Sequence, residues 1–310
     1  MISDLFTVTV LIGILSSGIR LATPYIYASI GEMFGQRSGV LNLGVEGQML
    51  LGAFAAFYIS LTTGNLWFGM LIAMLVGALM GLMMAFVTVN LHAQQGISGI
   101  GFYLFGLGMS DLLFQTLMGT VETVKGFPSI KIPGLGNIPG IGEIFFSQNI
   151  LVYGAYLLVP AAWFVLNKTT LGLKIRSVGE NPDAADSLGV SVARVRYFTI
   201  ILGGTLSGIA GASLSIALLN VFQQNMTSGL GFIAVALVYF GGWRPWGILG
   251  GALLFSMVNS LQLWIQVLGI PIPSEIAVMM PYVLTILVLV ATVSRVRVPS
   301  ALTKPFERED

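Results

Sequence analysis

The sequence predicts an all-α polytopic membrane protein with about ten transmembrane helices. Hydrophobic residues make up 55% of the chain and charged residues only 9%, with a mean hydropathy of +0.90. A soluble domain carries about 25% charged residues. Apolar runs of about 20 residues recur along most of the chain, and each could cross a hydrocarbon core about 30 Å thick. The few Lys and Arg residues gather in loops between these runs.

The composition and motifs exclude several classes of function. The chain has no cysteine and a single histidine, His92, which rules out disulfides, thiol catalysis and multi-His or Cys metal sites. It has no P-loop for ATP and no HExxH zinc motif. The net charge of +1 gives no sign of a nucleic-acid partner. We therefore expect a chain that is not an enzyme, has no catalytic residues and binds no metal or cofactor itself.

The apolar runs predict the spans in order. The first two are short, and Pro24 begins the second. A long extramembrane loop rich in Pro and Gly follows the fifth run. The predicted spans cover residues 5–19, 24–34, 46–61, 67–91, 97–117, 150–166, 197–219, 232–240, 247–268 and 276–293.

The sidedness of these spans follows from the basic residues. The stretch at residues 168–197 holds five of the fourteen Lys and Arg residues. Cytoplasmic loops of membrane proteins collect such residues, and we expect a cytoplasmic loop at about residues 167–195. With this loop inside, counting spans puts residues 120–149 outside and both termini in the cytoplasm. Arg20 then falls outside, as the one dissenting charge. We expect a multi-pass protein of the cytoplasmic membrane, embedded in the lipid bilayer.

The order of elements also suggests an internal repeat within a single transmembrane domain, residues 1–310. Ser38-Gly39 and Ser228-Gly229 are each followed by a short apolar helix, a long span and a further span. The two segments face opposite sides on the predicted topology. This predicts a 5+5 inverted repeat with broken helices meeting near the membrane midplane, as in many transporters. The repeats cover about residues 1–119 and 150–294, with an external loop at 120–149 and a cytoplasmic tail at 295–310.

A short capped helix is predicted inside the cytoplasmic loop. Asn181 is a good N-cap, and Pro182 suits the first helical position. Gly189 can end the helix in a left-handed conformation. Small residues, Ala184 and Ala185, would let another protein's surface approach closely. The alternative interpretation is an ordered loop that packs on its own protein.

Polar residues at the predicted breaks are candidates for a solute path. Asn42 and Glu46 lie four residues apart and would share a helix face. A carboxylate at membrane depth is energetically costly, which makes Glu46 a candidate functional residue. The alternative is that Glu46 satisfies the freed N–H groups of its own broken helix or pairs with Arg37. The candidate path residues are Asn42, Glu46, Gln48, Asp111 and Asn259.

Three stretches resemble the membrane permeases of ABC importers that serve ribose, other simple sugars, branched-chain amino acids and nucleosides. They are SGVLNLGVEGQMLLGAFAAF at residues 38–57, RSVGENPDAADSLGVSVARVRYFTIILGGTLSGIAGA at 176–212 and GFIAVALVYFGGWRPWGILGGALLF at 231–255. The likeness is closest to nucleoside-type permeases that pair with basic-membrane-lipoprotein-like binding proteins.

The resemblance implies an importer of a small polar solute, with a nucleoside or a simple sugar expected. It implies separate ATP-binding subunits that hold ATP and Mg, a second permease in a heterodimer, and an external substrate-binding lipoprotein. It also implies that the loop docks on the ATP-binding subunit. The residues expected to couple the subunits are Gly179, Glu180, Asn181, Pro182, Ala184, Ala185, Leu188 and Gly189.

A second class of function stays open from the residues alone. A secondary transporter that needs no ATPase could use the same inverted repeat, with Glu46 or Asp111 as a proton site. The capped cytoplasmic helix discriminates between the two, because a secondary transporter does not need it.

Overall fold

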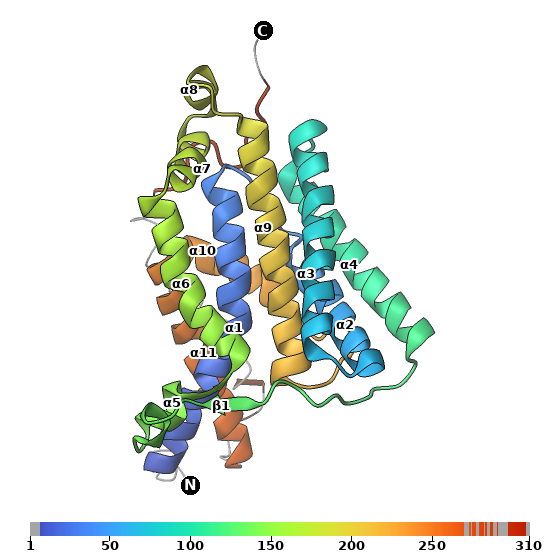
Figure 1. Cartoon of the computed structure of the whole chain (residues 1–310), viewed down its shortest axis with the longest axis vertical. Helices are drawn as coiled ribbons and strands as arrows, with labels where there is room; N and C mark the ends of the chain where they lie inside the picture. Colours follow the sequence, from blue (N-terminus) through green and yellow to red (C-terminus); the bar gives the residue numbers. More distant parts are fainter. Residues whose placement is uncertain are drawn as a thin grey trace.

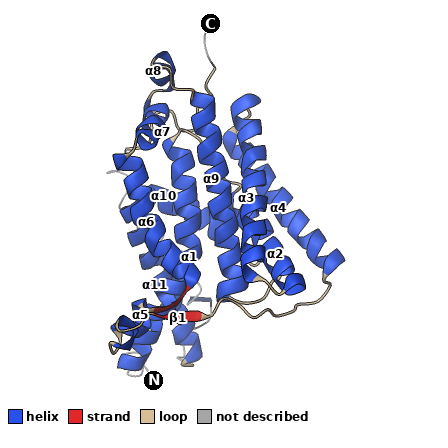
Figure 2. Cartoon of the chain, viewed as in Figure 1, coloured by secondary structure: helices blue, strands red, loops and turns tan. Residues whose placement is uncertain are grey.

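The computed structural model describes residues 7–269 and 297–307, with residues 273, 275, 276, 279–281, 283, 286, 287 and 290 between them. This part of the chain is mainly helical, with two short strands and loops between the helices, as Figures 1 and 2 show. Its elements are α1 (Val8–Arg37), α2 (Val45–Thr63), α3 (Leu66–Ala85), η2 (Phe86–Asn90), α4 (Gln95–Leu117), β1 (Ser129–Lys131), η3 (Leu135–Asn137), α5 (Ile141–Phe145), β2 (Ser147–Asn149), α6 (Ile150–Lys168), α7 (Thr170–Glu180), α8 (Pro182–Ser187), α9 (Val192–Ser213), η4 (Leu214–Leu218), α10 (Leu230–Phe240) and α11 (Pro245–Val267).

Seven helices in the described residues are long and apolar enough to cross a membrane. They are α1, α2, α3 extended by η2, α4, α6, α9 extended by η4, and α11. The shorter α10 is also apolar. The all-helical membrane class is therefore confirmed, and all but three of the predicted spans coincide with one described helix each. The predicted span at residues 276–293 lies largely outside the described residues.

The prediction of two short spans at residues 5–19 and 24–34 is wrong. α1 is one continuous helix of 30 residues with Pro24 inside it. A proline removes one backbone donor and crowds the preceding turn, but the packed helices around a membrane helix can satisfy the freed groups. A helix of this length measures about 45 Å, which is enough for one crossing.

This single helix also corrects the predicted position of the chain ends. Figure 1 shows the start of α1 and the C-terminal segment at opposite ends of the molecule. Near the start of α1, Ser16 Oγ donates to the carbonyl of Glu143 at 3.4 Å, whereas beyond its end the carbonyl of Gly39 accepts from the N–H of Thr303 at 3.1 Å. The start of α1 and residues 297–307 therefore lie at opposite ends of the described bundle. With one long helix in place of two short spans, the count of spans that put both chain ends in the cytoplasm no longer holds.

Helix α9 occupies the centre of the bundle and packs on α1, α2 and α3. Its glycines allow the backbones to approach closely, as small residues do in membrane helix pairs. A Cβ added at Gly203 would lie 3.1 Å from the carbonyl oxygen of Gly31, and one added at Gly52 would lie 2.8 Å from the Cα of Gly208. The glycines of α9 therefore form close contacts with the neighbouring helices.

The loop between α4 and α6 is ordered by backbone hydrogen bonds. β1 pairs antiparallel with β2, with Ser129 opposite Asn149. The loop is also anchored to the end of α9, since the N–H of Phe127 donates to the carbonyl of Ile216 at 3.0 Å. This loop lies at the end of the molecule opposite α7 and α8 (Figure 1). The two ends of the bundle therefore carry different structures.

Candidate functional site

The first candidate site is the place where the N-termini of α2 and α10 meet. Glu46, in the first turn of α2, points its carboxylate at the start of α10. Glu46 Oε1 accepts hydrogen bonds from the N–H of Gly229 and the hydroxyl of Thr227, both at 2.7 Å, and Oε2 accepts from the N–H of Gly231 at 2.5 Å. The side chain is 1% exposed.

This arrangement supplies hydrogen-bond acceptors to the N–H groups at the start of α10. The first N–H groups of a helix have no partner inside the helix, and the helix dipole places partial positive charge there. Glu46 lies at two such starts at once, that of α2 and that of α10. A Cβ on Gly231 would lie 2.5 Å from the backbone of Glu46, so only glycine fits this junction.

The alternative interpretation of Glu46 is thus correct in kind and wrong in partner, and its role in a solute path stays a prediction. Glu46 does satisfy freed N–H groups, but those of α10 rather than those of its own broken helix. Arg37 is engaged elsewhere, because its Nε and Nη2 donate to the carbonyl of Trp243 at 3.0 and 2.9 Å. Among the described residues no ion pair joins Arg37 to Glu46. In this conformation both oxygens of the Glu46 carboxylate accept hydrogen bonds from protein donors.

A second buried polar network holds the break between α1 and α2. Trp243 Nε1 donates to Gln36 Oε1 at 2.8 Å, and Gln36 Nε2 donates to Glu32 Oε1 at 2.9 Å. The same Glu32 oxygen accepts from the N–H of Asn42 at 3.0 Å. Asn42 Nδ2 then donates to Gln48 Oε1 at 3.2 Å. The network satisfies backbone and side-chain groups that would otherwise be buried without partners.

The structure therefore brings three of the five path candidates together. Asn42 and Gln48 are hydrogen-bonded, and Glu46 lies on the same helix as Gln48. Asp111 on α4 and Asn259 on α11 are half-buried, and no hydrogen bond among the described residues joins either one to that group. One oxygen of Asp111 is buried without a partner, as is Gln48 Nε2. These two atoms are the described candidates with unused polar capacity.

The sequence did not predict four residues of these two buried networks: Glu32, Gln36, Thr227 and Trp243. Glu32 and Gln36 lie four residues apart on α1, a spacing that places them on one helix face, and this signal could have found them. Nothing local marks Trp243 or Thr227, because their partners lie far away in the sequence.

The second candidate site is the end of the molecule that carries α7 and α8. The predicted capped helix is present as α8. Asn181 Oδ1 accepts from the N–H of Ala184 at 3.0 Å, and Pro182 occupies the first turn. Gly189 has φ of +81°, the left-handed conformation that favours glycine. Gly179 and Glu180 end α7, directly before this cap.

The two alanines of α8 face different ways. Ala185 is 3% exposed and belongs to the hydrophobic core of this chain. Ala184 is exposed, and the neighbouring Leu188 is 85% exposed. The expectation that Ala185 seats in a partner's groove is wrong, because its side chain already packs within its own chain. The outward surface of α8 is formed instead by Asp183, Ala184, Ser187, Leu188 and Gly189.

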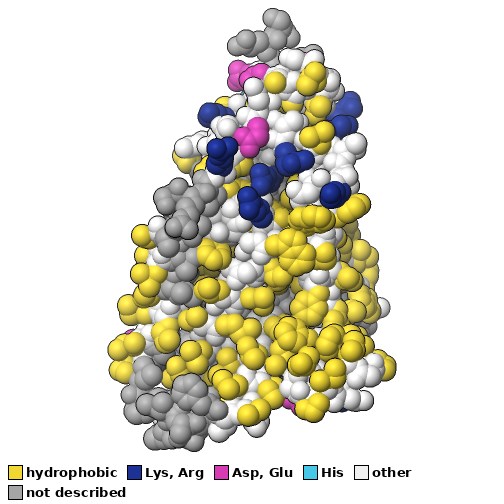
Figure 3. Space-filling model, turned by 90° about the vertical axis from the view of Figure 1, so that its left-hand side faces the viewer, with side chains coloured by type: hydrophobic (Ala, Val, Ile, Leu, Met, Phe, Trp, Pro, Cys, Tyr) yellow, Lys and Arg dark blue, Asp and Glu magenta, His cyan; other side chains and the backbone are white. Residues whose placement is uncertain are grey.

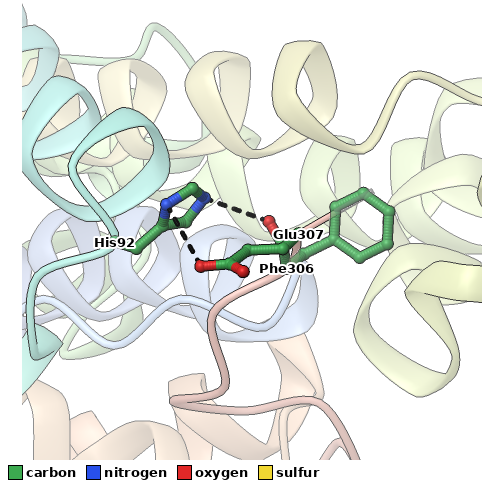
Figure 4. A network of polar contacts seen from close by, with 3 residues as sticks. All are labelled: His92, Phe306 and Glu307. Carbon is green, nitrogen blue, oxygen red and sulfur yellow. Dashed lines mark hydrogen bonds and ion pairs between the residues drawn. The ribbon is translucent and has the colours of Figure 1, made fainter. Parts of the chain in front are cut away.

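The C-terminal segment 297–307 completes this end of the molecule. The N–H of Ala301 donates to the carbonyl of Gly179 at 2.9 Å, and Ser300 Oγ donates to Glu180 at 3.2 Å. Figure 4 shows His92, just after η2, with Nε2 at 3.2 Å from the carbonyl of Phe306 and Nδ1 at 3.7 Å from Glu307. The segment therefore ties α7 to the first half of the chain.

Comparison with known proteins identifies relatives along nearly the whole chain. The family described as "Branched-chain amino acid transport system / permease component" matches residues 14–289. The putative glucose ABC transporter permease protein TsgC13 of Haloferax volcanii is 38% identical over 96% of this chain and 98% of its own length.

Two bacterial relatives are equally similar. The guanosine ABC transporter permease protein NupQ of Bacillus subtilis is 38% identical over 92% of this chain and 93% of its own length. The nucleoside ABC transporter permease protein NupC of Lactococcus lactis is 38% identical over 90% of this chain and 92% of its own length. No solved structure matches the chain.

Proposed function

Since this chain belongs to the family of branched-chain amino acid transport system permease components, we propose that it is the membrane-spanning permease subunit of an ABC importer for a nucleoside or a simple sugar. The relatives named above supply the two solute classes: two carry nucleoside or guanosine in their names, and one carries glucose. ATP hydrolysis belongs to a separate subunit, which holds ATP and Mg.

The observation that carries this proposal is α8. A short helix capped at both ends stands at the end of the bundle and presents the exposed Leu188. Such a helix is stiff, and an apolar side chain this exposed suits a docking contact. We propose that α8 seats on the ATP-binding subunit and couples hydrolysis to transport. Three residues make the contact with the ATP-binding subunit: Ala184, Leu188 and Gly189. Ala185 packs against its own chain and holds α8 in place. The residues that precede the helix fix its position: Gly179, Glu180, Asn181 and Pro182.

The sidedness and repeat are part of the same proposal. We propose that the α7–α8 end is cytoplasmic, because Lys and Arg gather there (Figure 3). The start of α1 is then external. The seven long helices, α10 and the predicted span at residues 276–293 give nine crossings. The same order of elements occurs at α1 to α3 and, with opposite direction, at α9 to α11. In each case a long helix is followed by a Gly-containing break, a helix and a long helix, which supports an inverted repeat.

The assembly we propose has four kinds of chain in one permease system. This single-domain chain pairs with a second, different permease, with ATP-binding subunits on the cytoplasmic side and with a solute-binding lipoprotein outside. The meeting point of α2 and α10 lies near the membrane midplane. Glu46 and Asn42 organise the break there, and Gln48 and Asp111 are the path candidates with unpaired polar atoms.

Reconstitution tests the proposal directly. The permease pair, the ATP-binding subunit and the binding lipoprotein are placed in vesicles, and uptake of labelled guanosine, adenosine and glucose is measured with and without ATP. We expect uptake of one solute class, and only with ATP and the ATP-binding subunit present. Uptake by the permease alone under an ion gradient would establish the secondary-transporter alternative instead.

A further inference from the structure

A groove rich in arginine lies at the α7–α8 end, between the end of α6, α7 and the turn from α10 to α11. Its volume is about 850 Å³. We call it the arginine groove and define it by Arg37, Arg176, Arg244, Trp163 and Trp246. Its remaining described lining residues are Leu166, Asn167, Gly241, Trp243, Pro245 and Gly247. The described lining thus carries three guanidinium groups and no carboxylate.

The three guanidinium groups retain most of their hydrogen-bonding capacity. Arg37 uses Nε and Nη2 on the carbonyl of Trp243, which fixes the group and leaves the Nη1 donors free. Arg176 makes one long bond of 3.4 Å from Nε to the carbonyl of Gly172. Arg244 is exposed and makes no hydrogen bond or ion pair within the described chain. Glu180 lies with Arg37 and Arg244 in the adjoining pocket. The three guanidinium groups of the groove therefore face one bordering carboxylate, and a bound anion would balance the remaining positive charge.

Two tryptophans fix the level of the groove relative to the bilayer. Trp163, in the last two turns of α6, is 38% exposed, and Trp246, in the first turn of α11, is 52% exposed. Both helices are candidate membrane spans, and Trp at the ends of spans sits at the headgroup level. Lys168 lies 5.9 Å from the centre of the Trp163 ring. Figure 3 shows a band of Lys and Arg bordering a broad hydrophobic surface.

We propose that the arginine groove binds the phosphodiester headgroup of an anionic phospholipid of the phosphatidylglycerol or cardiolipin class. Guanidinium groups grip phosphate through paired hydrogen bonds, and basic pockets between membrane helices recognise such headgroups. The tryptophans would flank the glycerol and upper acyl region. An acidic segment of a partner protein is less suited to the groove, because its rim belongs to the membrane-facing ends of α6 and α11.

The test measures how much lipid the detergent-purified permease retains. Dioleoyl-phosphatidylglycerol or dioleoyl-phosphatidylcholine is added, and bound lipid is detected by native mass spectrometry. The variant is Arg176→Ala with Arg244→Ala. The matched control is Lys174→Ala with Arg194→Ala, which removes the same charge from two exposed residues at the same end but outside the groove. Arg244→Gln alone serves if the double variant fails to fold, because the Arg244 side chain has no described partner.

We expect wild type and control to retain phosphatidylglycerol over phosphatidylcholine, and the groove variant to lose about thirtyfold in retention, or about fivefold for Arg244→Gln. Equal loss in control and variant, or no loss in either, would overturn the proposal. Displacement of the lipid by a few millimolar inorganic phosphate would reassign the groove to a free anion. Lost binding of the ATP-binding subunit with lipid retention unchanged would make the groove a protein contact.

Discussion

Glu46 accepts a hydrogen bond at 2.7 Å from the backbone N–H of Gly229, a residue 183 positions further along the chain. One carboxylate thereby joins the start of α2 to the start of α10. Both helices begin at this point, and their dipoles converge on the same negative charge. The junction is therefore a single electrostatic unit, and the two halves of the chain cannot move apart there without exposing it.

Replacing Glu46 should destabilise the permease strongly. Glu46→Ala leaves two N–H groups and one hydroxyl without an acceptor, and each buried unsatisfied group costs about 1–3 kcal/mol. We expect a loss of about 3–5 kcal/mol in the free energy of unfolding, and roughly half of that for Glu46→Gln, which keeps one oxygen. Thermal unfolding in detergent measures it. The control is Glu143→Ala, an exposed acidic residue in the first turn of α5. Wild-type melting of Glu46→Ala would show that the junction is not held by this carboxylate.

Enlarging a glycine of α9 should separate the central helices. A Cβ at Gly208 would collide with the carbonyl oxygen of Ala73 on α3. We expect Gly208→Val to cost about 1–3 kcal/mol or more through overpacking and to lower the yield of monodisperse protein in size-exclusion chromatography. Gly101→Val on α4 is the matched control, because nothing lies within 4 Å of a Cβ there. Equal yields for the two variants would argue against close packing at Gly208.

A charge at Leu188 should weaken docking of the ATP-binding subunit. Burying a leucine side chain contributes about 1.5–3 kcal/mol, so Leu188→Asp should reduce affinity at least about tenfold. Pull-down and substrate-stimulated ATPase activity measure the effect. Val121→Asp makes the same kind of change on an exposed residue of the α4–α6 loop and should leave both readouts unchanged. Full ATPase stimulation in Leu188→Asp would remove α8 from the coupling contact.

The two alanines of α8 should respond differently to the same substitution. Ala185→Trp places a bulky ring where the side chain is buried in its own chain, and we expect it to lower permease stability by about 1–3 kcal/mol. Ala184→Trp adds the ring to the outer surface, so it should leave the melting temperature unchanged and reduce docking. A reversed pattern would mean that α8 faces the other way.

The orientation of α1 can be tested by cysteine labelling, because the chain has no cysteine of its own. Single substitutions Val8→Cys, Val121→Cys and Leu188→Cys place thiols on exposed residues. An impermeant maleimide added to intact cells should label Val8→Cys and Val121→Cys, whereas Leu188→Cys should react only after permeabilisation. If Val8→Cys reacted only after permeabilisation, as Leu188→Cys should, both residues would lie on the cytoplasmic side. The chain would then cross the membrane twice before residue 38.

What could be predicted from the sequence depends on how far each signal reaches. The capping residues of α8 lie within a few positions of the helix, so the sequence pattern Asn181, Pro182 and Gly189 predicts the helix correctly. The direction of Ala185 depends on packing against other helices, which no local pattern records. The predicted span boundary at Pro24 is wrong because the effect of a proline on a helix depends on the groups packed around it. The sequence around Pro24 does not show those groups. The partners of Glu46 lie in the other half of the chain, beyond any pattern of spacing.

The contacts of the segment at residues 297–307 have a consequence for biogenesis. Through Gly39, His92 and Gly179 the segment bonds to three parts of the chain that are all synthesised before it. Its docking closes long loops, so it follows the insertion of the helices rather than guiding it. The surface around α7 is thus completed only after the preceding helices have been synthesised, and a chain that lacks this segment would offer the ATP-binding subunit an incomplete face.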